Sequence, residues 1–287
     1  MKHAIIPIVL AGAALLAGTA WLGAAPTAPE PVRIASYTGE AMEPFVSRDG
    51  KFLFFNTRND PGVDTNLHVA EVSFDGHFRY LGLLEGTRST DLDAVATMSA
   101  DSRFCFISPR EYRRTLVSVF CGTFDGTKVV DAAPQTGLAT ARLGRLIFDM
   151  EISADGRSMV YAEGSFSGKA TPDDADLYLA KQGVNGFEPD ASGKRILARL
   201  NTDALEYAPA LSADGLSLTF TRLEGVWPFQ SPSLLRATRS HTSQYFGEPK
   251  RITAIDGFVE GASYAPDGAL YFHKRVTNRF QIWRLPR

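Results

Sequence analysis

The stretch LSADGLSLTF at residues 211–220 has near-copies elsewhere in the chain. ISADGRSMVY at 152–161 and VSRDGKFLFF at 46–55 repeat its serine, its Asp-Gly pair and its alternating apolar residues. Each copy predicts a strand, a two-residue turn and a second strand. A hairpin that recurs at a fixed interval indicates a repeat architecture.

Five such hairpins follow one another at a period of about fifty residues, and their turn aspartates are Asp49, Asp101, Asp155, Asp214 and Asp267. A third strand is expected after each hairpin, at 66–72, 116–122, 176–182, 234–240 and 281–287. A fourth strand is expected in the first four repeats, at 78–86, 128–137, 194–202 and 250–257. The fifth repeat ends without one. The segment 32–40 has the same pattern and precedes the first repeat, so it is expected to complete the last sheet.

This pattern predicts an all-β, five-bladed β-propeller of four-stranded antiparallel blades, the last blade closed by the N-terminal strand. The hairpin S-x-D-G followed by a strand such as NLHVAEV (66–72) or DLYLAKQ (176–182) resembles the TolB-like repeat, also called the PD40 or WD40-like repeat. The resemblance covers the propeller, residues 32–287. The family's TolB proteins are expected to carry an extra α/β domain and six blades, which this chain lacks.

The first residues indicate export. Lys2 precedes an apolar stretch that runs from Ala4 to about residue 25, and a Pro/Ala-rich linker follows at 26–31. We interpret residues 1–25 as a signal peptide, or as a membrane anchor if they are not cleaved. The expected location is therefore periplasmic or secreted, with inner-membrane anchoring toward the periplasm as the alternative. Contact with a membrane is expected only through this segment.

Composition excludes several classes of function. The formal net charge of −2 gives no basic footprint for nucleic acid. The two cysteines, Cys105 and Cys121, fall in one predicted hairpin and are either buried apolar residues or a cross-strand disulfide. No metal or cofactor motif and no G-x-S-x-G elbow is present, so no cofactor, metal site or catalytic nucleophile is expected.

The aspartates of the turns are expected to be structural, because an Asp-Gly pair supplies turn geometry and local hydrogen bonds. A second set of carboxylates lies six to eight residues before the turns and is expected at the mouth of the central channel: Glu43, Asp93, Asp149, Glu206 and Glu260. Carboxylates that converge there would bind a cation, raise one another's pKa or form hydrogen bonds to a ligand. The alternative is that they cap strand ends and pair with neighbouring basic residues such as Arg110 and Arg222.

The loops between the second and third strands open onto the same mouth. Loops on a rigid scaffold commonly carry binding residues. The candidates on this loop-rich face are Arg58, Asp60, Tyr112, Arg113, Asp173, Trp227 and Phe229. The alternative for the two aromatic residues is that they fold over the edge of a blade.

These features favour a non-enzymatic, exported propeller that binds a protein or an envelope glycan through its loops. The alternative is a glycoside hydrolase or another carbohydrate-active enzyme, since five-bladed propellers also house glycosidases with paired carboxylates in the central depression. Carboxylates that face each other in an open funnel with aromatic side chains would favour hydrolysis. A narrow, plugged channel would favour display.

Overall fold

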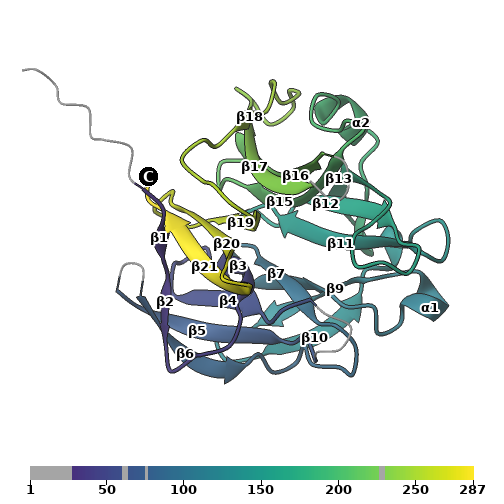
Figure 1. The fold of residues 1–287 in the computed structure, drawn as a ribbon. Coiled ribbons are helices and arrows are strands. Elements are labelled where there is room, and N and C mark those ends of the chain that lie inside the picture. The colour runs from purple at the N-terminus through teal and green to yellow at the C-terminus, as the bar shows by residue number, and fades with distance from the viewer. Residues whose placement is uncertain (1–27, 60–63, 75–76, 226–229) are drawn as a thin grey trace, which may run out of the picture.

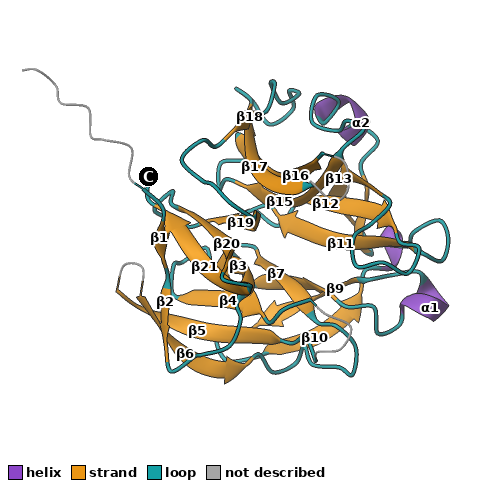
Figure 2. Cartoon of the chain, in the orientation of Figure 1, coloured by secondary structure: helices purple, strands orange, loops and turns teal. Residues whose placement is uncertain are grey.

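A computed structural model describes residues 28–287 of the chain, except 60–63, 75–76 and 226–229. Its strands form five sheets, which follow one another around a common axis (Figure 1). Two short α-helices occur in the described residues, α1 (Tyr112–Thr115) and α2 (Gly193–Ile196), with one 3-10 helix, η1 (Thr136–Leu138), and the rest is strand and loop (Figure 2). The prediction of an all-β, five-bladed propeller is confirmed.

Each blade is a meander whose first strand lies closest to the axis, since the first strands of successive blades contact one another. Blade 1 contains β3 (Met42–Val46), β4 (Phe52–Asn56), β5 (Leu67–Phe74) and β6 (His77–Leu83). Blade 2 contains β7 (Ala94–Met98), β8 (Arg103–Ile107), β9 (Val119–Phe124) and β10 (Val129–Pro134).

The remaining blades follow the same plan. Blade 3 contains β11 (Arg145–Ile152), β12 (Ser158–Ser165), β13 (Asp174–Gly183) and β14 (Gly186–Pro189). Blade 4 contains β15 (Leu205–Leu211), β16 (Ser217–Glu224), β17 (Ser231–Thr238) and β18 (Lys250–Arg251). Blade 5 contains β19 (Val259–Tyr264), β20 (Leu270–Val276), β21 (Arg279–Leu285) and, from the other end of the chain, β1 (Glu30–Pro31).

The N-terminal segment closes the ring, but with fewer residues than the sequence predicts. β1 pairs antiparallel with β21, and the Val32 amide extends this contact by donating to the Ile282 carbonyl at 2.9 Å. The closing strand therefore begins within the segment expected to be a linker. From Arg33 the chain crosses to blade 1, where β2 (Arg33–Ala35) pairs in parallel with β6. One segment thus covers the outer edges of both the last and the first blade.

The prediction of a fourth strand at 194–202 in blade 3 is wrong. That segment forms α2 and the turns after it, and β14 is the outer strand. Gly183 and Gly186 flank a two-residue turn, which returns the chain at once to the edge of β13. Ile196, Leu197 and Leu200 then pack at helical spacing into the apolar cluster between blades 3 and 4. Their apolar spacing fits a helix as well as a strand.

The repeated serine and aspartate hold the inner turns together, as expected. Ser47 Oγ donates to Asp49 Oδ1 at 2.6 Å, and the same atom of Asp49 accepts the Lys51 amide at 3.1 Å. The serine–aspartate bond recurs at 2.6 Å in the turns of blades 3 and 4. These aspartates are structural residues of the turn face.

Aromatic packing joins neighbouring blades. Phe54 of blade 1 meets Phe104 and Phe124 of blade 2 edge to face, with ring centroids 5.0 and 5.1 Å apart. Within blade 2, Cys105 on β8 and Cys121 on β9 are opposite one another and form a disulfide, which is one of the two states the sequence left open.

The turn of blade 2 differs from the others because Ser102 takes the left-handed position, with φ of 67°. Gly50 holds the equivalent position in blade 1, with φ of 74°. A Cβ in this region costs about 1 kcal/mol. We therefore expect Ser102→Gly to raise the free energy of unfolding by about 1 kcal/mol, measured by urea denaturation.

The reciprocal variant Gly50→Ser is the matched control. Its new Cβ would meet Pro266 Cγ at an ordinary contact distance of 3.7 Å, so backbone strain alone is added. It is expected to lower the free energy of unfolding by a similar amount. Unchanged stability in both variants would contradict this account of the turn.

Candidate active site

Every innermost strand has an irregular register close to six residues before its turn aspartate. In four blades the residue at this point has a positive φ: Glu43 (51°), Val95 (55°), Ala208 (48°) and Gly261 (60°). In blade 3 it is Asp149. Such bulges bend a strand and re-aim its side chains. Here they turn the first strands at the level where the blades meet at the axis.

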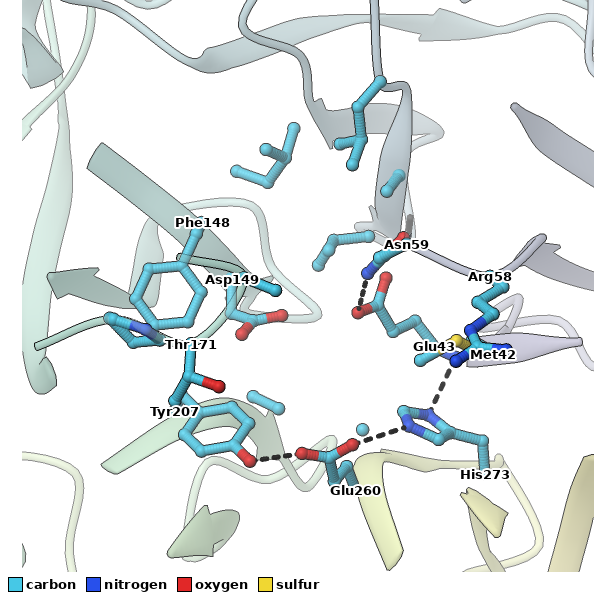
Figure 3. Close-up of a pocket in the computed structure, with 18 of the residues that line it drawn as sticks. Met42, Glu43, Arg58, Asn59, Phe148, Asp149, Thr171, Tyr207, Glu260 and His273 are labelled. Atoms are coloured by element: carbon cyan, nitrogen blue, oxygen red, sulfur yellow. Dashed lines mark hydrogen bonds and ion pairs between the residues drawn. The ribbon is translucent and has the colours of Figure 1, made fainter. Parts of the chain in front are cut away.

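A cavity of about 570 Å³ lies at this level and extends to the loops between the second and third strands. Glu43 of blade 1, Asp149 of blade 3 and Glu260 of blade 5 contribute carboxylates to it (Figure 3). Its aromatic lining residues are Phe148, Phe166, Tyr207, Phe258 and Phe280. The volume falls in the range of small-molecule sites.

Glu43 has one oxygen fixed and one free. Asn59 Nδ2 donates to Glu43 Oε1 at 2.8 Å, while Oε2 is buried and has no hydrogen-bond partner among the described residues. Burial raises the pKa of Glu43, and the negative charge of Glu260 adds to the rise, against the opposing effect of His273 and the neighbouring asparagine amides. Glu43 is thus a cavity-lining carboxyl group whose second oxygen has no hydrogen-bond partner among the described residues.

Asp149 is the most strongly perturbed carboxyl group of the site. Burial raises its pKa well above the ordinary value, and the charges of Glu43 and Glu260 raise it further, while the backbone N–H of Ala208 opposes the shift. The side chain points into the cavity from the side of Phe148 and Thr171 (Figure 3). This environment favours the protonated acid.

Glu260 is held by two donors. The Tyr207 hydroxyl donates to Oε1, and Oε2 lies 3.4 Å from His273 Nε2. The other ring nitrogen of His273, Nδ1, accepts the backbone N–H of Glu43 at 3.1 Å (Figure 3). His273 therefore contacts both Glu260 and the Glu43 backbone, and it connects the last blade to the first.

The other two predicted channel carboxylates lie elsewhere. Asp93 pairs with Arg110 at 2.6 Å, and Glu206 pairs with Arg222 at 2.7 Å. Both are fully buried and also accept bonds from the loop that precedes their strand, so they cap and pair as the alternative interpretation expected. Each stands eight residues before its turn aspartate. The residues that reach the cavity stand six or seven before it.

The structure separates the predicted loop residues. Arg58 lines the cavity. Tyr112 is buried and its hydroxyl donates to the carbonyls of Arg142 and Arg145, so it is structural. Arg113 on α1 is exposed, and the exposed Asp173 pairs with Lys169 at 3.3 Å. Asp60, Trp227 and Phe229 lie outside the described residues.

Several lining residues were not found from the sequence. Tyr207 and Phe148 stand seven residues before their turn aspartates, as Glu260 does, and an alignment of the repeats by column would have exposed them. His273 lies on β20 and Asn59 in a polar loop, and the repeat pattern marks neither of them as a lining residue. Among the described residues, no cluster of three or more His, Cys, Asp or Glu side chains has the arrangement of a metal site.

A buried ion pair bridges the blades at the turn end of the channel. Arg48 of blade 1 contacts Glu151 of blade 3 at 2.5 Å and the Met98 carbonyl of blade 2 at 3.2 Å. Burial raises the pKa of Glu151 to about 7, against the opposing charge of Arg48. Above it, the channel narrows to a void of about 20 Å³. The large cavity therefore lies on the loop face.

Comparison with solved structures places the protein among known propellers. A structure described as a complex of BT0996 with RGII matches with a TM-score of 0.60 at 11% identity, over 91% of this sequence and 92% of that one. A protein described as an exo-β-1,3-galactanase from Bifidobacterium bifidum s17 matches at 0.58 and 10% identity, over 91% and 92%. An endo-arabinase from Bacteroides thetaiotaomicron matches at 0.54 and 11% identity, over 90% and 98%.

The chain is thus a five-bladed β-propeller, and likeness at these identities establishes the fold alone. A protein described as TolB from Agrobacterium tumefaciens also matches, with a TM-score of 0.51 at 14% identity over 89% of this sequence and 78% of that one. No protein-family model and no curated protein sequence matches the chain.

The expectation of a non-enzymatic binding protein is corrected by these findings. The similar propellers include proteins described as a galactanase and an arabinase. In this chain, three carboxyl groups share a cavity with aromatic side chains. The loop face expected to dock a partner supplies only Arg58 to this cavity among the described candidates.

The perturbed acid predicts a pH-dependent stability. Because folding raises the pKa of Asp149, its contribution is present below the unfolded pKa of about 4 and is lost as pH rises toward the folded value. Asp149→Asn removes this loss and keeps an acceptor for the Ala208 amide. We expect the variant to gain melting temperature over the wild type at pH 8, and less at pH 4. Exposed Asp203→Asn is the control, and an equal gain at both pH values would contradict the assignment.

The paired carboxylates predict a different response. Arg222→Met leaves the buried Glu206 without its cation and should lower the free energy of unfolding by about 3 kcal/mol, measured by urea denaturation. Arg157→Met, on an exposed arginine of the turn face, should change it by less than about 0.5 kcal/mol. A small effect at Arg222 would show that Glu206 is not part of the framework.

Proposed function

We propose that this protein is a carbohydrate-active enzyme that hydrolyses a glycosidic bond in the axial cavity. The observation that carries the proposal is the meeting of Glu43 and Asp149 in one cavity, in different environments. Asp149 is held as an acid by burial and by neighbouring charges, and Glu43 presents an unpartnered oxygen. Two carboxyl groups with different roles are what glycoside hydrolysis requires.

The roles follow from the two environments. Asp149 donates its proton to the glycosidic oxygen as the bond to the anomeric carbon breaks. Glu43, ionised, either takes a proton from the attacking water or attacks the anomeric carbon itself, and water later releases the sugar. In the first case the anomeric configuration inverts, and in the second it is retained, so proton NMR of the fresh product distinguishes them.

Glu260, Tyr207 and His273 position the site. The two donors fix the Glu260 carboxylate, whose charge adds to the effects of burial and of Glu43 in raising the pKa of Asp149. The aromatic walls offer flat apolar faces of the kind on which a sugar ring packs. Phe148 and Tyr207 lie next to the acid, on the same side of the cavity (Figure 3).

We also propose that the blades are TolB-type repeats and that the chain is exported. The repeated hairpin and the TolB match support the first proposal. The N-terminal pattern and the Cys105–Cys121 disulfide support the second, since disulfides persist in oxidising compartments. In the described part of the chain, no helix has the length and apolar character to cross a membrane.

A screen of aryl glycosides and plant and bacterial oligosaccharides tests the activity. Asp149→Asn and Glu43→Gln should each reduce turnover by about 10²–10⁴-fold. Activity should rise with pH as Glu43 ionises and fall as Asp149 loses its proton. Both changes in the pH–activity profile should occur at a higher pH than the usual pKa of a carboxyl group, because the pKa values of both residues are raised.

Glu188→Gln, on the exposed outer strand of blade 3, is the matched control and should keep full activity. Melting temperatures of all variants exclude unfolding as the cause of a loss. Hydrolysis that survives both Asp149→Asn and Glu43→Gln would overturn the assignment of these residues, and the absence of hydrolysis from the whole screen would overturn the proposed function.

A further inference from the structure

Arg58 brings a positive charge into a cavity of carboxylates and aromatic rings. It stands in the loop between β4 and β5, where Thr65 Oγ1 donates to its carbonyl at 2.8 Å and fixes the backbone. Its guanidinium carbon lies 5.9 Å from the centre of the Phe280 ring. The next residue, Asn59, holds Glu43, so one loop supplies both the cation and the support of a reacting carboxylate.

Arg58 differs from the other arginines near the axis. Arg48, Arg110 and Arg222 each pair with a buried carboxylate at 2.7 Å or less. Among the described residues, Arg58 has no such pair within 4.0 Å, although three carboxylates line the same cavity. The groups that shift the pKa of Asp149 do not include Arg58 either. Its guanidinium lies near Glu43 and His273, across the cavity from Asp149 in the view of Figure 3.

A guanidinium beside an aromatic wall gains most from an anionic, planar partner. A carboxylate matches its fork of N–H donors and forms two parallel hydrogen bonds, which are stronger where water is excluded. Protonation of Asp149 removes one of the negative charges that would repel an anion. Arg58 is also the only arginine or lysine among the described lining residues, so it is the one with a permanent positive charge.

We infer that the substrate carries a carboxylate on the sugar that enters the cavity, which makes it a uronic acid glycan, and that Arg58 binds this carboxylate. The inference rests on the proposed function, because it names the substrate class of the same site. It requires no additional cofactor or step, since Arg58 acts only in recognition.

Isothermal titration with matched monosaccharides tests the inference. The pairs are D-glucuronate with D-glucose, D-galacturonate with D-galactose and D-mannuronate with D-mannose. The members of each pair differ only at C6, where the uronate has a carboxylate and the neutral sugar a hydroxymethyl group. At least one uronate should bind about tenfold or more tightly than its neutral partner. Arg58→Met should bring that ratio near one. Arg157→Met, which removes an exposed arginine of the opposite face, should keep the preference.

Two results would overturn the inference: no pair in which the uronate binds more tightly, or a preference that survives in Arg58→Met with its fold intact. The two proposals fail separately. If the protein hydrolyses only neutral glycosides, and this activity is lost in Asp149→Asn but unchanged in Arg58→Met, the proposed hydrolase activity stands and the inference of a uronate substrate is wrong. If uronate binding depends on Arg58 but no glycan is hydrolysed, the inferred ligand class stands and the proposed hydrolase activity is wrong.

Discussion

The closure of the ring by the N-terminal strand is the contact on which the rest of the structure depends. A single blade has two open edges and two faces without a partner, so it gains stability only when neighbours cover it. β1 on β21 completes the last blade, and β2 on β6 covers the first. This closure also sets blades 5 and 1 side by side, so that His273 can accept the backbone N–H of Glu43.

The site then follows from irregularity in otherwise regular strands. A regular strand alternates its side chains between two faces, and the bulges of the innermost strands interrupt that alternation next to the axis. They place Glu43 and Asp149 in the cavity, while similar acidic residues two positions earlier remain in ion pairs. Backbone strain at this point, with positive φ at Glu43 and Ala208, accompanies the arrangement of the carboxyl groups.

Features set by local interactions were predictable from the sequence. The Ser-Asp-Gly turns are local, so five hairpins and a propeller could be derived from them. The outer strand of blade 3 and the path of residues 33–35 depend on which sheet edge is open. A short segment of sequence does not contain this information, because it is set by strands elsewhere in the chain. For the same reason the five acidic residues before the turns were equivalent candidates for the channel in the sequence. Only the register of the bulges in the structure distinguished Asp149 from Asp93. Function was harder still, because the state of each carboxyl group depends on burial and on charges from other blades.

The bond between His273 and the Glu43 amide joins residues 230 positions apart in the sequence. No single repeat contains the acid, the free carboxylate and the fixed one, since they come from blades 3, 1 and 5. During synthesis four complete hairpins exist before the fifth emerges, yet the cavity has an open side until the last strand pairs with the first. A truncated polypeptide therefore cannot bring these three carboxyl groups together in one cavity, however well its repeats fold.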